Sequence, residues 1–233
     1  MIILWTDALI YILIAIVTLL FFSLRGKQHF VRPWKKISHN RTAMVALVFL
    51  VFFLVIGLLD SIHFRPTNSQ NNDIISVLDY WVNPIRLKQE KSYSAPFSAN
   101  LYSKELIMNS GQAPYWGYPR LEYGGRHLSD VQAQKACDIL AKATLGFLKG
   151  IAVIFILFYA YHLLWQRTFF SNKAVNTIFA TLFFLVSSSY MLLELTTYYH
   201  VMGTDKVGED VFYQTIKSIR TGLVIGSLTT LIM

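Results

Sequence analysis

Four long apolar blocks divide the chain and predict membrane-spanning helices. The clearest runs from Ala43 to Leu59, with Gly57 as its weakest helix former. At a rise of about 1.5 Å per residue its roughly 17 residues reach about 25 Å, close to the thickness of a bilayer core. The other blocks are Ala8 to Leu24, Gly146 to Trp165 and Val175 to Leu195. Their apolar character predicts an all-α membrane protein, a polytopic transmembrane helical bundle.

A short basic segment between the first two blocks predicts the orientation of the bundle. It carries no acidic residue, and its basic residues are Arg25, Lys27, Arg32, Lys35, Lys36 and Arg41. Short loops with this excess of Lys and Arg stay in the cytoplasm, so the N-terminus is expected outside. The loop after the third block contains Arg167 and Lys173 and again no acid, which gives the same orientation. Residues 1–59 and 145–196 therefore each form a pair of spans.

The segment from 60 to 144 is polar and rich in Asn, Ser, Tyr and Pro, which predicts an extracytoplasmic inserted segment. A helix is expected within Ile74–Leu87, and turns at Ala113–Pro119 and at Tyr123–Gly125. The aromatic residues are expected to form a small core or to rest at the membrane interface, and a ligand-binding surface is the alternative. They are Tyr115, Trp116, Tyr118 and Tyr123.

The last segment, 197–233, combines a Gly-Thr-Asp motif with an amphipathic helix. One predicted helical face carries Phe212, Ile216, Ile219 and Leu223, with Gln214, Lys217 and Arg220 elsewhere. From Thr221 the chain is apolar to Met233, but these roughly 13 residues reach only about 20 Å, too short to cross a bilayer. We therefore expect the start of a further, truncated transmembrane helix, and the chain to be the N-terminal portion of a longer protein.

Composition and motifs narrow the function. The chain is 54% hydrophobic and 15% charged, with a net charge of +8. Six of its 21 Lys and Arg residues lie in one short loop, which indicates a topology signal, so no nucleic-acid partner is expected. No phosphate-binding glycine loop, dinucleotide fingerprint or histidine pair at metal-ligand spacing occurs, and Cys137 is the only cysteine. We predict no catalytic residue, no metal site, no cofactor and no enzyme activity. Asp205 or Asp210 is expected to cap the helix that follows.

Two segments resemble a known transporter family. His200 to Val211 reads HVMGTDKVGEDV and is followed by Arg220, and Trp34 to Ala43 reads WKKISHNRTA before the second block. This is similar to dipeptide/oligopeptide ABC importer permeases of the DppC/OppC type, which have approximately G-T-D-x-x-G-R-D-V before a membrane helix. Glu209 stands where that family usually has arginine. Gln214 and Ser218 replace a common arginine and a common glycine.

The resemblance implies a permease subunit of a binding-protein-dependent importer in a bacterial cell inner membrane, moving peptides or similar small solutes. Its partners would be a second permease subunit, cytoplasmic ATP-binding subunits, an extracytoplasmic solute-binding protein and membrane lipid. The residues implied to shape the external entrance of the pore are Gly203, Thr204, Asp205, Gly208, Asp210 and Arg220. The alternative is a membrane-anchored extracytoplasmic binding or sensor protein, or an accessory subunit.

Overall fold

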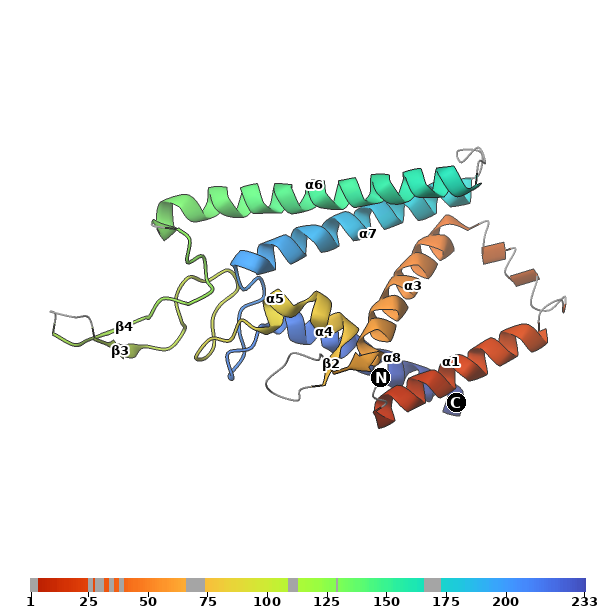
Figure 1. Cartoon of the computed structure of the whole chain (residues 1–233), viewed down its shortest axis with the longest axis horizontal. Coiled ribbons are helices and arrows are strands. Elements are labelled where there is room, and N and C mark those ends of the chain that lie inside the picture. The colour runs from red at the N-terminus through yellow and green to blue at the C-terminus, as the bar shows by residue number, and fades with distance from the viewer. Residues whose placement is uncertain are drawn as a thin grey trace. The chain divides into compact units, whose positions relative to one another are not determined.

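The computed structural model describes residues 4–24, 27, 32–33, 36–37, 40–65, 74–108, 113–128, 130–165 and 173–233. The protein is mostly helical and consists of two compact units (Figure 1). The first unit contains residues 1–81, 166–182 and 216–233, and the second contains 82–165 and 183–215. Two of the six predicted basic loop residues, Arg25 and Lys35, lie outside the described residues.

The first unit is built on helices α1 (Trp5–Leu24) and α3 (Arg41–Ser61). Asn40 caps α3, because its side-chain oxygen accepts the N–H of Thr42 at 3.1 Å. After α3, β1 (His63–Phe64) pairs antiparallel with β2 (Ile75–Ser76), placing His63 opposite Ser76. Helix α4 (Val77–Trp81) follows at once and packs on α3.

The second unit holds short helix α5 (Asn83–Arg86), strands β3 (Glu105–Ile107) and β4 (Tyr115–Gly117), and long helix α6 (Val131–Trp165). Helices α7 (Lys173–Tyr198) and α8 (Val211–Ile232) each pass from one unit to the other. Strands β3 and β4 form an antiparallel hairpin in which Leu106 faces Trp116. The amphipathic stretch and the apolar end of the chain are thus one continuous helix, α8.

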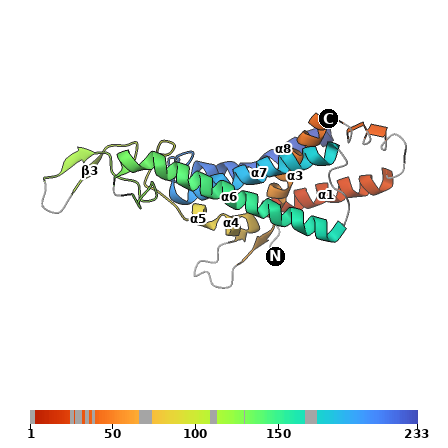
Figure 2. The same ribbon diagram turned by 90° about the horizontal axis from the view of Figure 1, so that it is seen from above.

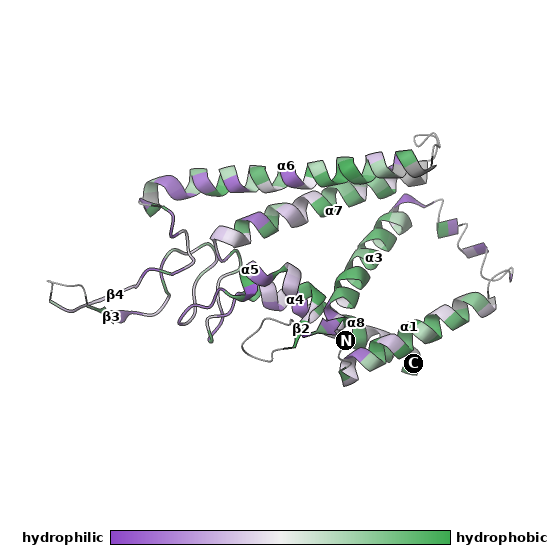
Figure 3. Ribbon diagram, viewed as in Figure 1, coloured by the Kyte–Doolittle hydropathy of each residue, from purple (hydrophilic) through white to green (hydrophobic). Residues whose placement is uncertain are grey.

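Three described helices are long and apolar enough to cross a membrane: Arg41–Ser61, Ala133–Ala160 and Asn176–Tyr198. They correspond to the second, third and fourth predicted spans. The first predicted span is helical, but its apolar stretch Trp5–Leu20 is shorter than these three. Green, hydrophobic colour covers α3 and the C-terminal part of α6, whereas hydrophilic positions are interspersed in the N-terminal part of α6 (Figure 3).

Several local predictions need correction. The region Ala113–Pro119, predicted as a turn, contains strand β4, because its aromatic residues pair across the hairpin with Leu106 and Ile107. The boundary placed at residue 144 falls inside α6, since 131–144 is rich in the strong helix formers Ala, Gln, Lys and Leu. Charged residues interrupt the apolar pattern in this part of the helix, so an apolar run does not indicate it. The range Ile74–Leu87 contains helix as predicted, but as two short helices, α4 and α5, that follow strand β2.

Helix α6 and residues 183–198 of α7 run side by side in both views, at a close approach that two glycines allow (Figures 1 and 2). A Cβ on Gly150 would lie 2.7 Å from Ser187 Cα, and one on Gly146 would lie 2.8 Å from Met191 Cα. Ser187 is fully buried there, as expected of a small residue at a close contact between two helices. Lys149 and Glu194 pair beside the contact at 2.7 Å.

We predict that Gly150→Leu destabilises the protein by about 1–3 kcal/mol, because the side chain would force the α6 and α7 backbones apart. Gly222→Leu in α8 is the matched control, since nothing lies within 4 Å of its added Cβ. Helicity followed by circular dichroism during a titration from mild detergent into SDS measures both. Equal midpoints for the two variants would contradict the close α6–α7 contact.

Candidate functional site

The Gly-Thr-Asp motif forms a folded loop, Gly203–Asp210, which we call the GTD loop. Its two glycines have φ values of +79° and +84°, in the left-handed region that other residues rarely adopt. A Cβ on Gly203 would collide with the Ser94 carbonyl oxygen, and one on Gly208 with the backbone of Glu90. Both glycines are therefore required by conformation and by the closeness of segment 90–94.

The two aspartates of the loop accept backbone N–H groups. Asp205 Oδ1 accepts from Val207 and Glu209, each at 2.9 Å, and closes the turn. Asp210 Oδ1 accepts the Phe212 N–H at 2.8 Å, so Asp210 is the N-cap of α8, one of the two predicted candidates. Burial raises the pKa of Asp205, but hydrogen bonds from Gln214 and from backbone N–H groups outweigh it and hold that pKa below its usual value.

The GTD loop is joined to the preceding polar segment by side-chain and backbone bonds. Thr204 is buried and donates its hydroxyl to the Ser92 carbonyl at 2.7 Å. Its N–H donates to the Ser94 carbonyl at 3.3 Å, and the Glu90 N–H donates to the Gly208 carbonyl at 2.9 Å. Sequence positions more than 100 residues apart therefore meet here, which fixes the polar segment to the junction of α7 and α8.

A buried histidine lies between two carboxylates at the base of the loop. His200 Nδ1 is 2.7 Å from Asp210 Oδ2, and its Nε2 is 3.5 Å from Glu90 Oε1. Glu90 also accepts the N–H groups of Glu122 at 3.1 Å and Tyr123 at 2.7 Å. Burial lowers the pKa of His200, but the hydrogen bond with Asp210 and the nearby carboxylates of Asp210 and Glu90 outweigh it and raise that pKa above 6.5. His200 therefore connects the end of α7 to Asp210 before α8, and Glu90 connects this group to residues 122–123.

Lys88 caps the other side of this junction. Its ammonium group donates to the Thr196 carbonyl at 2.7 Å and to the Thr197 carbonyl, both in the last turn of α7. These carbonyls have no partner within the helix, so a buried cation satisfies them and opposes the negative end of the helix dipole. Burial lowers the pKa of Lys88 to about 8, although the charge of Asp210 acts in the opposite direction.

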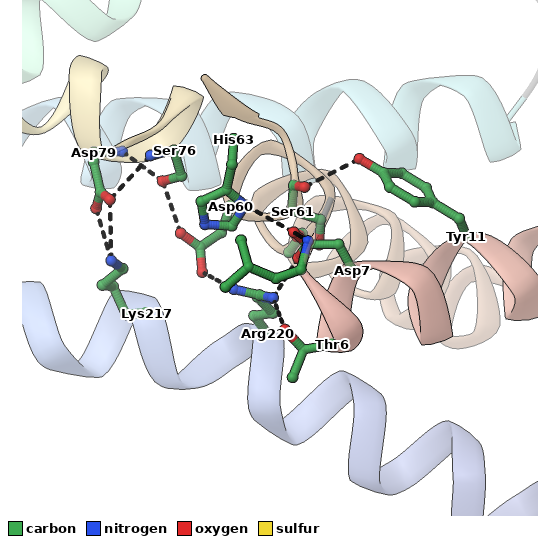
Figure 4. A network of polar contacts seen from close by, with 12 residues as sticks. Thr6, Asp7, Tyr11, Asp60, Ser61, His63, Ser76, Asp79, Lys217 and Arg220 are labelled. Carbon is green, nitrogen blue, oxygen red and sulfur yellow. Dashed lines mark hydrogen bonds and ion pairs between the residues drawn. The ribbon is translucent and has the colours of Figure 1, made fainter. Parts of the chain in front are cut away.

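In the first unit, Arg220 of α8 is the centre of a second buried group, the polar cluster (Figure 4). The cluster comprises Asp7, Asp60, His63, Asp79, Lys217 and Arg220. Arg220 donates to Thr6 and to the fully buried Asp7, and lies 3.7 Å from Asp60. His63 Nδ1 lies 2.9 Å from Asp7, in an orientation that makes no hydrogen bond.

The rest of the cluster extends to α4. Lys217 lies 3.0 Å from Asp79, and the Ser76 hydroxyl donates to Asp60 at 2.9 Å. Asp79 also accepts the Ser76 N–H at 3.1 Å. Three buried carboxylates thus meet two cations, which ties α8 to the start of α1, the end of α3 and α4.

The predicted site residues fall in two different places. Gly203, Thr204, Asp205, Gly208 and Asp210 share the GTD loop of the second unit, whereas Arg220 belongs to the first unit. Four predicted topology residues are described, and Arg41 begins α3. They are Lys27, Arg32, Lys36 and Arg41.

Sequence reasoning missed the partners of these residues. Asp7, Asp60 and Asp79 were not singled out, nor were Glu90 and Lys88. For Asp7 and Asp60 a signal existed, because each is a lone carboxylate at the edge of an apolar block and Arg220 is a lone cation at the edge of another. Charges at such positions in membrane helices generally pair with one another. Glu90 and Lys88 carried no comparable signal.

The residues around the GTD loop and those of the polar cluster are suited to fixing the positions of helices and loops. Each buried carboxylate accepts from a cation, a hydroxyl or an N–H group. Among the described residues no set of three or more His, Cys, Asp or Glu side chains could hold a metal ion. Comparison of the chain with family models, curated proteins and solved structures gives no match.

We predict that Arg220→Met destabilises the protein by about 3–5 kcal/mol, because it leaves Asp7 buried without a cation. The double variant Asp7→Asn/Arg220→Met should recover part of the loss. Lys217→Met is the control and should cost less, about 1 kcal/mol, since Lys217 is 37% exposed and Asp79 keeps its Ser76 N–H. Unfolding in SDS is the measurement, and equal losses for Arg220→Met and Lys217→Met would refute a central role for Arg220.

We also predict that the junction at His200 weakens as pH rises. Because the folded pKa of His200 lies above 6.5, its protonated form contributes stability that is complete below 6.5 and is lost as pH rises through the folded pKa. Thermal midpoints in detergent should fall from pH 6 to pH 8 in the wild type and change less in His200→Asn. Lys88 has the opposite dependence, with stability rising between about pH 8 and 10.5, so the window ends at pH 8. Parallel pH curves would contradict this role of His200.

Proposed function

We propose that this chain belongs to the permease of a binding-protein-dependent ABC importer and lies as a multi-pass protein in a bacterial inner membrane. The observation that carries the proposal is the GTD loop. Its glycines, its N-cap Asp210 and its bonds to segment 90–94 make it a rigid element that leads directly into α8. Such a loop suits the external entrance of a translocation pathway, where a membrane helix must begin at a fixed place.

The polar cluster supports the orientation on which this proposal depends. Asp7 lies near the start of α1 and Asp60 near the end of α3, and Arg220 contacts or approaches both. These two helix ends are therefore on the same side of the first unit, and the opposite ends, Leu24 of α1 and Arg41 of α3, are the ones that the basic segment connects along the chain. With that basic segment in the cytoplasm, the polar cluster faces the external side.

The proposed partners follow from this arrangement. A second permease subunit would complete the pathway beside the apolar helices, and cytoplasmic ATP-binding subunits would drive it. An extracytoplasmic solute-binding protein would deliver peptides or similar small solutes to the GTD loop. In this function the chain catalyses no covalent step and needs no resident cofactor.

A membrane-anchored extracytoplasmic binding or accessory protein is the second candidate. It is favoured by the folded polar segment 88–128, in which Leu101 and Leu121 are buried and Glu90 and Arg120 bind backbone groups. A segment with its own core can act as a binding domain. The two candidates differ in whether other transporter subunits accompany the chain.

Affinity purification of the tagged chain from native membranes in mild detergent tests the proposal. We expect a second permease subunit and ATP-binding subunits to co-purify, and Gly208→Val to reduce their yield, because valine cannot adopt the φ of +84° against Glu90. Gly226→Val, where nothing lies within 4 Å of the added Cβ, is the control. Recovery of a stable chain without these subunits would contradict the importer and favour the anchored binding protein.

A further inference from the structure

His63 is a buried side chain of the polar cluster that has an unsatisfied ring nitrogen. It lies in β1, directly after α3, and only 9% of its side chain is exposed. Its Nδ1 atom faces the fully buried Asp7 and is 2.9 Å from Oδ2 of that carboxylate (Figure 4). Even so, no hydrogen bond satisfies Nδ1 among the residues that the structure describes. Buried polar atoms are nearly always hydrogen-bonded, so this nitrogen indicates a binding site.

The chemistry of the two facing atoms indicates what this site binds. A carboxylate oxygen only accepts hydrogen bonds, and an unprotonated Nδ1 would also present an electron pair to it. Two electron pairs repel at this distance, whereas 2.9 Å is the usual separation of an N–H···O bond, which a small rotation of the ring would align. Metal is the alternative, but no described set of three or more His, Cys, Asp or Glu side chains could hold a metal ion. The pair therefore requires a proton on Nδ1.

The charges around His63 decide whether that proton is an additional one. In the described part of the chain, the neighbouring helices supply three carboxylates, two cations and two tyrosines: Asp7 and Tyr11 of α1, Asp60 of α3, Asp79 and Tyr80 of α4, and Lys217 and Arg220 of α8. Tyrosines are neutral near pH 7, so three negative charges face two positive ones. With a neutral His63 the cluster would keep one uncompensated negative charge, which is costly in a buried position. A positively charged His63 balances it.

The uncompensated charge falls on two carboxylates that share one cation. Asp79 has its own cation, because Lys217 lies 3.0 Å from it. Asp7 and Asp60 share the guanidinium of Arg220, which donates to Asp7 and lies 3.7 Å from Asp60. These two carboxylates have one cation between them in the described cluster. The imidazole at 2.9 Å therefore lies where a second cation would bind Asp7.

We propose that the polar cluster is a proton-binding site, in which His63 takes up one proton from water and, as an imidazolium, donates from Nδ1 to Asp7. Binding forms one N–H bond on the ring, and release returns the proton to water with no other bond changed. Release would leave Asp7 and Asp60 dependent on Arg220 alone and so weaken the contact of α8 with α1 and α3. The position of α8 within the first unit is thereby linked to pH. This property does not depend on the proposed function.

NMR spectroscopy of the full chain in mild detergent, with 15N-labelled histidine, tests the site. The ring nitrogens of an imidazolium have chemical shifts that differ from those of either neutral form. The signal that is lost in His63→Gln identifies His63. At pH 7.5 an unperturbed histidine is about one-tenth protonated. We expect His63 to be mostly imidazolium at that pH.

Removal of one negative charge from the cluster should remove the need for the proton. In Asp7→Asn the imidazolium share of His63 at pH 7.5 should fall about fivefold, toward that of an unperturbed histidine. Asp60→Asn should have the same effect and keeps the pair of Asp7 and Arg220, so it replaces Asp7→Asn if that variant does not fold. The control is Glu122→Gln, which neutralises a carboxylate of the second unit that is 61% exposed and should leave His63 unchanged.

Three results would each overturn the proton-binding site. A His63 that is neutral at pH 7.5, with its hydrogen on Nδ1, would show that the ring donates to Asp7 without an additional proton. An imidazolium share that is unchanged in both aspartate variants would show that charge balance does not hold the proton. A change in the His63 signal on treatment with EDTA would indicate a bound metal ion instead. None of these measurements involves another transporter subunit, so their outcome is independent of the importer proposal.

Discussion

A carboxylate removed from water needs a cation or several hydrogen bonds, and this requirement organises the protein. Asp7 in the first unit and Asp210 in the second are both nearly or fully buried. Asp7 accepts a hydrogen bond from Arg220. Asp210 pairs with His200 and caps the first turn of α8. The first pair joins α1 to α8, which are distant in sequence, and the second joins the consecutive helices α7 and α8, so the positions of these helices within their units depend on satisfying these charges.

The same requirement explains why the GTD loop has one conformation. Glycine at 203 and at 208 permits the turns, but the partners of the loop choose among the conformations that glycine allows. Thr204, the Gly208 carbonyl and Asp210 each bind an element other than the loop. Glycine therefore makes the loop possible, and bonds to segment 90–94 and to His200 hold it in one conformation. This loop, placed directly before α8, is the feature on which the proposed transport role rests.

The apolar helices stabilise the protein in a different way, through close packing at glycine residues. Gly146 and Gly150 let α6 approach the backbone of α7, and Gly57 lets α3 approach Leu223 of α8. Between α1, α3 and α8 this leaves a small apolar pocket of about 130 Å³, lined by residues that include Leu13, Leu54 and Val224. In a lipid environment such contacts gain from close packing rather than from exclusion of water. Close packing thus joins the apolar stretches of these helices, and charge pairing joins their ends.

The amino-acid sequence by itself determined the mostly helical character, three of the long apolar helices and the restriction of the N-cap to Asp205 or Asp210, because hydrophobic runs and capping are local properties. The pairing of Asp7 with Arg220 and of Glu90 with His200 was decided by tertiary structure, since residues far apart in sequence must first be brought together. The start of α6 and strand β4 were also decided there: charged helix formers conceal the former, and cross-strand pairing creates the latter. The sequence specifies which charged residues and glycines are present, and the fold determines which residues each of them contacts.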